Sequence, residues 1–103
     1  MNIKFTPRAE SEAEAKTRWW RRNREASPNL FDDELAEALA AIRRDPTIGA
    51  INPSRHPAIV RKRLMPRTKN HVYFAVHEGV ILIVSIWGGA PSPWPEAVMG
   101  LGC

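Results

Sequence analysis

The chain of 103 residues has little cysteine and no long hydrophobic run. Its single cysteine, Cys103, has no partner in the chain, which excludes an internal disulfide bond and a metal site built from several cysteines. The longest apolar stretch, residues 80–87, is interrupted by Ser85 and is far shorter than the roughly 20 residues that span a bilayer. The first residues show neither the apolar segment nor the cleavage site of a secretory signal. We therefore expect a cytoplasmic protein without membrane contact, metal or other cofactor.

Acidic residues are absent from residues 55–69, although the chain as a whole has 15 basic and 11 acidic residues and a net charge of +4. Basic and acidic residues balance over residues 1–50, so the excess lies in the second half. A block of one sign creates a local positive potential that favours an anionic partner. The alternative is a solvated surface that only keeps the protein soluble. The basic residues of this block are Arg55, Arg61, Lys62, Arg63, Arg67 and Lys69.

The first half of the sequence has helical periodicity after a short alternating segment at residues 3–5. Thr6 and Pro7 are typical of a helix start, and this helix is predicted to run to about residue 25. Ser27 and Pro28 repeat the start signal for a second helix, which ends before Asp45. The two helices are expected to form an antiparallel hairpin. Residues 46–57 hold three prolines and a glycine, which predicts a loop without regular structure.

The second half changes to strand-like segments at residues 59–65, 71–77 and 80–87, separated by turn residues. They predict a meander in which the last strand is central and the middle strand turns its more polar face away from the helices. The expected fold is α+β: a short N-terminal strand, an antiparallel helical hairpin, then a three-stranded antiparallel meander forming one small sheet. We expect a single domain over residues 1–88 and a tail rich in proline and glycine over residues 89–103.

Five strings carry a family resemblance when they are taken in order: FTPRAE at residues 5–10, the apolar and acidic residues 31–39, RKRLMPRT at 61–68, HVYFAV at 71–76 and VSIWG at 84–88. Together they resemble the RelE/ParE superfamily of bacterial toxins over about residues 3–88. The resemblance implies the toxin of a type II toxin-antitoxin system, which a cognate antitoxin neutralises in a hetero-oligomer. It also implies one of two activities, because members are either ribosome-dependent mRNA endonucleases (RelE-like) or inhibitors of DNA gyrase (ParE-like).

The endonuclease alternative requires groups that activate the 2′-hydroxyl, stabilise the phosphorane and protonate the leaving oxygen. In the RelE-like pattern, cations come from the strand that carries Arg61 and Arg63 here, and further groups follow the last strand. Residues 88–95 have no ionisable side chain, so the expected groups at that end are missing. His71 and His77 remain as a substitute pair, so a nuclease site would comprise Arg61, Arg63, His71 and His77. The alternative is that both histidines are ordinary surface or packing residues.

The ParE-like interpretation needs a binding surface in place of a reaction centre, and the turn at residues 66–68 followed by HVYF favours it. We therefore expect a toxin that binds DNA gyrase. The alternatives are an endonuclease that acts on mRNA at the ribosome and a non-toxic basic module that binds nucleic acid or protein. Trp20 and Trp87 are expected in the core. The surface for the target or the antitoxin is predicted to comprise Arg55, Arg61, Lys62, Arg63, Arg67, Lys69, Trp19 and Trp94.

Overall fold

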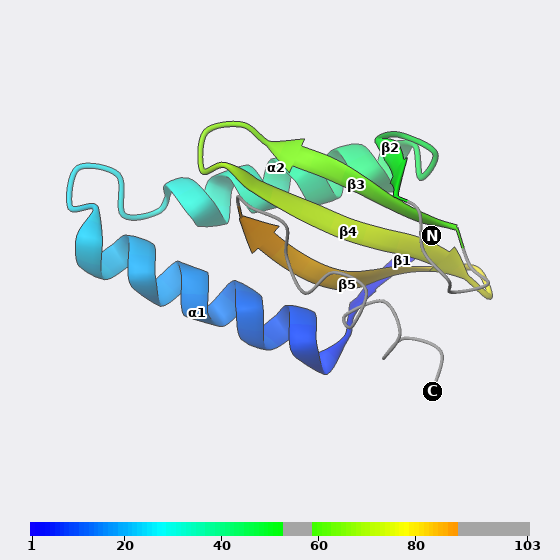
Figure 1. Cartoon of the computed structure of the whole chain (residues 1–103), viewed down its shortest axis with the longest axis horizontal. Helices are drawn as coiled ribbons and strands as arrows, with labels where there is room; N and C mark the ends of the chain where they lie inside the picture. Colours follow the sequence, from blue (N-terminus) through cyan, green and yellow to red (C-terminus); the bar gives the residue numbers. More distant parts are fainter. Residues whose placement is uncertain (53–58, 89–103) are drawn as a thin grey trace.

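The computed structural model describes residues 1–52 and 59–88, in which two helices pack on a five-stranded sheet (Figure 1). The strand order is β1-β5-β4-β3-β2, parallel between β1 and β5 and antiparallel elsewhere. This arrangement confirms the predicted α+β fold. Neither of these helices is long and apolar enough to cross a membrane. The elements are β1 (Asn2–Phe5), α1 (Pro7–Asn23), α2 (Leu30–Arg44), β2 (Ala50–Asn52), β3 (Val60–Met65), β4 (Asn70–His77) and β5 (Val80–Gly88).

Helix α1 begins where the sequence predicts, and α2 does not. The Thr6 hydroxyl accepts a hydrogen bond from the Ala9 amide at 3.1 Å and Pro7 is the first helical residue, as expected for an N-terminal cap. The predicted start of α2 at Ser27 is wrong, because the Ser27 carbonyl accepts a bond from the Leu30 amide within the connecting turn. Helix α2 begins at Leu30 instead. Helix α1 ends at Asn23, slightly before the predicted end.

Strand β5 lies between β1 and β4, which confirms its predicted central position. A register shift places Tyr73 opposite Ser85 and Phe74 opposite Ile83, so that Val84 is an extra residue in β5. Such a bulge changes the alternation of side chains along a strand. Ile83 and Ile86 therefore both belong to the core beneath the helices, although three positions separate them. The apolar run before the bulge does not alternate either, because Ile81 and Ile83 pack beneath the helices while Leu82 packs on the other face of the sheet.

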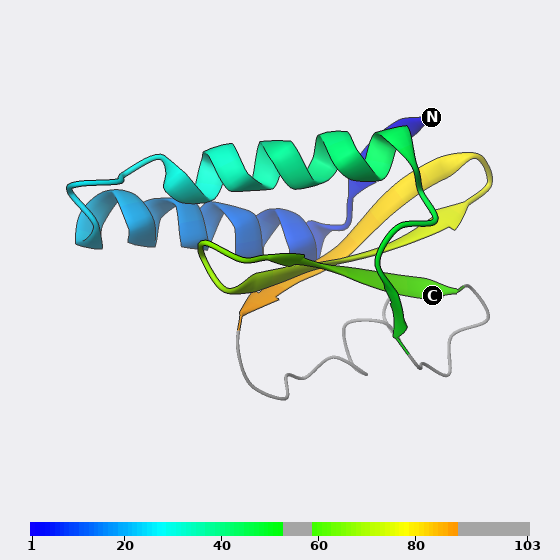
Figure 2. The same ribbon diagram turned by 90° about the horizontal axis from the view of Figure 1, so that it is seen from above.

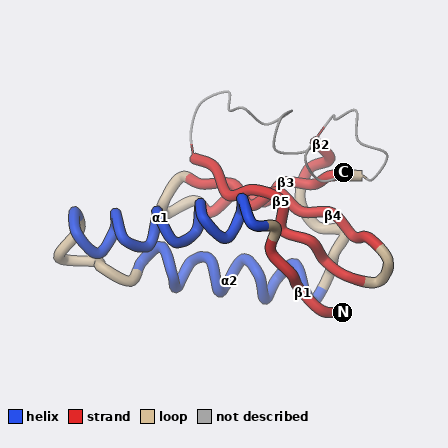
Figure 3. Tube along the Cα trace, turned by 90° about the horizontal axis from the view of Figure 1, so that it is seen from below, coloured by secondary structure: helices blue, strands red, loops and turns tan. Residues whose placement is uncertain are grey.

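Both helices cover the same face of the sheet (Figures 2 and 3). The main core lies between them and the strands, where Phe31 and Ile42 of α2 meet Phe74 of β4, all fully buried. The other face was predicted to be more polar, but it carries a second apolar cluster. The cluster is itself a small buried core, because its four central members are only 1–8% exposed. It consists of Val60, Tyr73, Ala75 and Val84, with Leu82 and Trp87 packed against it.

The segment predicted as an irregular loop contains strand β2, which pairs with β3 through Ala50 opposite Lys62. Gly49 makes this pairing possible. Its φ is 85° and a Cβ there would lie 2.5 Å from the Lys62 carbonyl oxygen, so a larger residue would separate the two segments. Three residues are too few to show alternation, and the proline and glycine content around them favoured a loop.

A buried carboxylate fastens α2 to the turn between β3 and β4. Glu34 accepts bonds from the amides of Arg67 and Thr68 at 2.7 and 2.9 Å, and from the Thr68 hydroxyl at 2.7 Å. Burial alone would raise the pKa of Glu34, but the hydrogen bonds from Thr68 and Arg67 outweigh it and hold the pKa below its ordinary value. Glu34 is thus ionised and satisfied inside the fold.

Candidate functional site

The cations of β3 are divided between the two faces of the sheet. Residues directly opposite each other in an antiparallel pair share a face. Arg61 and Arg63 lie opposite the core residues Phe74 and Val72, on the side of the helices. Lys62 lies opposite Tyr73, on the open face. These three predicted site residues therefore cannot all contact the same reacting group.

The two histidines lie far apart along β4. His71 shares the open face with Lys62, and its pKa is lowered by burial and by the Lys62 charge, so it is neutral at pH 7. His77 lies six positions further on, which corresponds to about 20 Å of strand. Its imidazole is exposed and lies 3.7 Å from the Glu78 carboxylate. Arg63 and His71 line one pocket together with Lys62, but Arg61 and His77 lie elsewhere, so the structure brings together only two of the four predicted nuclease residues.

Two further cations of the basic block lie in the turn between β3 and β4. The guanidinium of Arg67 bonds to Glu37 at 2.5 Å and lies 3.4 Å from Glu34. It is paired inside the chain, which leaves less of its charge for a partner. Lys69 is exposed and has a φ of 62°. The remaining predicted site residues, Arg55 and Trp94, lie outside the described residues.

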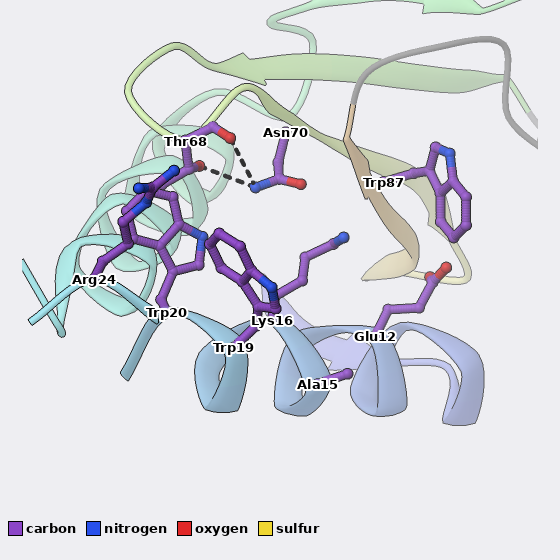
Figure 4. Close-up of a pocket in the computed structure, with 9 residues that line it drawn as sticks. All are labelled: Glu12, Ala15, Lys16, Trp19, Trp20, Arg24, Thr68, Asn70 and Trp87. Atoms are coloured by element: carbon purple, nitrogen blue, oxygen red, sulfur yellow. Dashed lines mark hydrogen bonds between the residues drawn. The ribbon is translucent and has the colours of Figure 1, made fainter. Parts of the chain in front are cut away.

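A pocket of about 550 Å³ lies between α1 and the ends of β4 and β5 (Figure 4). The indole groups of three tryptophans form much of the pocket wall. The rings of Trp19 and Trp20 meet edge to face, with centroids 5.7 Å apart. Trp19 is 48% exposed, which agrees with its prediction as a surface residue. The lining comprises Glu12, Ala15, Lys16, Trp19 and Trp20 of α1, then Arg24, Thr68, Asn70 and Trp87.

Helical spacing and one carboxylate position the pocket. Glu12, Lys16 and Trp20 follow each other at intervals of four residues, so they form one stripe of α1. The Glu12 carboxylate accepts bonds from the Ser85 hydroxyl at 2.9 Å and the Ile86 amide at 3.1 Å. It thereby occupies the edge of β5 beyond the end of β1 and fixes α1 against the strand.

Two cations lie on the indole surfaces of the pocket. The Lys16 ammonium is 5.5 Å from the centre of the Trp87 ring, and the Arg24 guanidinium is 5.4 and 5.8 Å from the Trp19 and Trp20 rings. These distances are typical of cation–π contacts. Burial lowers the pKa of Lys16, and the charge of Glu12 opposes this effect.

Asn70 forms the polar end of the pocket and is 4% exposed. Its amide nitrogen donates to the Thr68 hydroxyl at 3.1 Å. Within the described ranges 1–52 and 59–88, its side-chain oxygen accepts no hydrogen bond, and Figure 4 shows this oxygen turned away from Thr68. The pocket therefore offers a buried acceptor beside two cations.

The sequence predicts only part of this pocket. Trp20 and Trp87 were expected in the core; both pack partly against apolar clusters and also line the pocket. The roles of Lys16 and Arg24 were missed. The helical spacing of Glu12, Lys16 and Trp20 indicates that they share one face of the helix. No sequence pattern indicates that Asn70 belongs to the pocket, because its position depends on tertiary packing.

Neither a protein-family model nor a curated protein matches the sequence. Two solved structures do match the fold. One is described as the chromosomal ParDE toxin-antitoxin system from P. aeruginosa, with a TM-score of 0.69 and 22% identity over 87% of this chain and 97% of that chain. The other is the YoeB dimer from Staphylococcus aureus, with a TM-score of 0.56 and 17% identity over 87% of this chain and 98% of that chain. The chain shares the fold of both structures.

This shared fold agrees with the family resemblance of the sequence strings. Their residues lie in the same elements that the resemblance implied: the start of α1, the body of α2 and the strands β3 to β5. At these sequence identities the likeness concerns the fold, and a fold can host several functions.

Proposed function

We propose that this chain is the toxin of a type II toxin-antitoxin pair, that it acts in the ParE-like manner by binding DNA gyrase, and that a cognate antitoxin neutralises it. The fold shared with a chain of the ParDE toxin-antitoxin structure is the observation that carries this proposal. The family resemblance of the sequence supports the same interpretation. The fold is an analogy between proteins, so the geometry of the site has to support it independently.

The distribution of ionisable groups supports binding over cleavage. General acid–base catalysis needs its groups within hydrogen-bond reach of one reacting centre. Arg63 and His71 line one pocket, but Arg61 lines a different one and His77 lies at the far end of β4, so the four predicted groups do not converge. A protein target needs no such convergence, because separate charges and apolar residues can each contact it.

The open face of the sheet offers a surface of the required kind. Lys62 lies next to Leu64 along this face, and the Leu64 side chain is 49% exposed. The buried apolar cluster beneath them makes this surface rigid. Charge steers the approach of an acidic target, and apolar contacts supply affinity. We therefore assign the gyrase contact to the open face around Lys62 and Leu64.

Induced expression followed by two assays tests the proposal. We expect growth arrest in cells that lack the antitoxin, and inhibition of supercoiling when purified chain is added to gyrase. Lys62→Glu should weaken both effects. Arg22→Glu, in the exposed last turn of α1, is the matched charge reversal and should leave both unchanged. Supercoiling that proceeds normally at saturating protein would contradict the proposal.

The endonuclease is the second candidate because His71 and Lys62 share the open face. A neutral histidine can accept the proton of a 2′-hydroxyl, and the nearby ammonium can stabilise a charged phosphorane. This version replaces the predicted set of Arg61, Arg63, His71 and His77 by Lys62 and His71. It requires mRNA cleavage on ribosomes that His71→Ala abolishes and His77→Ala does not. Cleavage that survives in His71→Ala would exclude it.

A further inference from the structure

We infer that the pocket formed by α1 and the ends of β4 and β5 binds an acidic peptide segment of a partner protein, with a carboxylate at Lys16 and a peptide N–H at Asn70. The inference deepens the proposed function and rests on it only for the identity of the partner, the antitoxin. The preference of the pocket for an acidic peptide follows from its own groups.

The first of these groups is a cation that no close carboxylate pairs. Among the described residues the Lys16 ammonium makes no ion pair within 4 Å and no hydrogen bond; it lies 5.5 Å from the centre of the Trp87 ring, and the Glu12 charge acts on it from a greater distance than an ion pair. Glu12 lies on the same stripe, but its carboxylate is bonded to Ser85 and Ile86. A half-buried ammonium is stabilised most by a charge-assisted hydrogen bond to an incoming carboxylate.

The second group is the side-chain oxygen of Asn70. Asn70 is 4% exposed, and its amide nitrogen is engaged with Thr68 while the oxygen accepts no bond within the described residues. A buried carbonyl without a donor is unfavourable, so a ligand that brings an N–H group relieves it. A peptide segment carries both a side-chain carboxylate and backbone N–H donors, whereas a fatty acid or inorganic anion lacks the donor.

The walls of the pocket match apolar side chains next to the carboxylate. Trp19 is 48% exposed and stands against Trp20, so a leucine or phenylalanine of the partner finds indole surface. The pocket volume of about 550 Å³ is in the range of specific binding pockets. Arg24, which covers both indoles, adds a second positive charge at this end.

A nucleic acid fits the same groups less well. Lys16 and Arg24 are the only cations among the described lining residues, which is few for a backbone that carries a negative charge at every nucleotide. The amide of Asn70 already donates to Thr68, so it cannot read a base with both of its polar atoms. The observations therefore favour the acidic peptide.

Tryptophan fluorescence and calorimetry of the full chain at low salt test the inference. The probe is the acetylated, amidated hexapeptide Asp-Leu-Phe-Glu-Leu-Asp, and its twin carries Asn and Gln at the acidic positions. We expect the acidic peptide to bind at least about tenfold more tightly than the twin. Lys16→Met should remove about tenfold of this affinity, since it deletes the ammonium and keeps a long side chain. Lys4→Met, on exposed β1, is the control and should bind like the wild type.

Several results would overturn the inference. These are equal affinity for the two peptides, equal effects of Lys16→Met and Lys4→Met, and tighter binding of a uridine hexanucleotide than of the acidic peptide. If Lys16→Met fails to fold, Trp19→Ser replaces it, because that side chain is half exposed; unchanged peptide affinity in this variant also contradicts the inference. Peptide binding in a chain that neither arrests growth nor inhibits gyrase would contradict the proposed function and leave the pocket assignment intact. Growth arrest without selective peptide binding would contradict the pocket assignment and leave the proposed function intact.

Discussion

Replacing Glu34 by glutamine is expected to destabilise the fold more than any other single charge removal in α2. The side chain is 4% exposed, and the carboxylate accepts bonds from two amides and one hydroxyl of the turn between β3 and β4. A glutamine retains one oxygen and turns an NH₂ group toward the donors that met the other oxygen. The variant thereby loses two hydrogen bonds to a charged acceptor, and its NH₂ group faces N–H or O–H donors of the turn that it cannot accept from.

The expected loss follows from the value of such bonds. A hydrogen bond to a charged group contributes about 1.5–3 kcal/mol, so two of them with partial rearrangement give a loss of about 3 kcal/mol. This is a large share of the roughly 5–15 kcal/mol that stabilises a typical domain. For a domain of this size it lowers the melting temperature by about 15 °C. Urea unfolding followed by circular dichroism at pH 7 measures the free energy directly.

Glu37→Gln is the matched control. Glu37 lies on the same helix and bonds to Arg67 at 2.5 Å, but its side chain is 66% exposed, and exposed ion pairs contribute little to stability. We expect this variant to unfold almost at the wild-type urea concentration. If Glu34→Gln lost no more stability than Glu37→Gln, the argument that the buried carboxylate fastens α2 to the turn would be wrong.

The same carboxylate predicts a pH dependence. The folded-state pKa of Glu34 lies below its ordinary value, so its contribution is fully present above the unfolded pKa of about 4.3. The contribution is lost as the pH falls through the lower folded-state pKa. The difference in unfolding free energy between wild type and Glu34→Gln should therefore be constant near neutrality and shrink under acid. A difference that grew on acidification would contradict the sign of this shift.

Three further variants test other contacts. Thr6→Ala removes the cap of α1 and the bond from its hydroxyl to the Val84 carbonyl, and should cost about 1–2 kcal/mol in urea unfolding; no loss would contradict the cap. Glu12→Ala leaves the Ile86 amide without its acceptor, so hydrogen exchange of that amide should accelerate, and unchanged protection would refute its role at the edge of β5. Gly88→Ala places a Cβ 2.6 Å from the Asn70 side-chain oxygen. This variant should displace the Asn70 side chain and lower the free energy of unfolding by about 1 kcal/mol or more. An unchanged melting temperature would show that Asn70 is not tightly packed against Gly88.

The sequence predicted the elements that have strong local signals. The start of α1 was predicted because Thr6 and Pro7 are a capping pair, and the three strands were predicted because their apolar runs are bounded by turn residues. Strand β2 was missed because its pairing depends on Gly49 approaching Lys62, which lies on a strand further along the chain. The bulge at Val84 was missed for the same reason, since it exists only relative to β4.

The site was less predictable than the fold. Trp19 was predicted as a surface residue and is half exposed, and the basic stretch was found by counting charge. The alternation of side chains along a strand is enough to predict that Arg61 and Arg63 lie on one face and Lys62 on the other. A count of charges does not reveal this division. The pairing of Arg67 with Glu34 could not be found locally, because 33 positions separate the two residues.

The parallel pairing of β1 with β5 has a consequence for synthesis of the chain. Asn2 lies opposite Val80, and the bonds from Thr6 to Ile83 and Val84 continue that seam. Pairing between strands so far apart in the sequence is slow to form, because the chain between β1 and β5 must close into a loop before the contacts of the two strands can stabilise it. During translation the first strand therefore waits, unpaired, until the last strand has been made. The sheet is completed only after β5 emerges from the ribosome, so a partner that recognises the finished sheet cannot bind a shorter nascent chain.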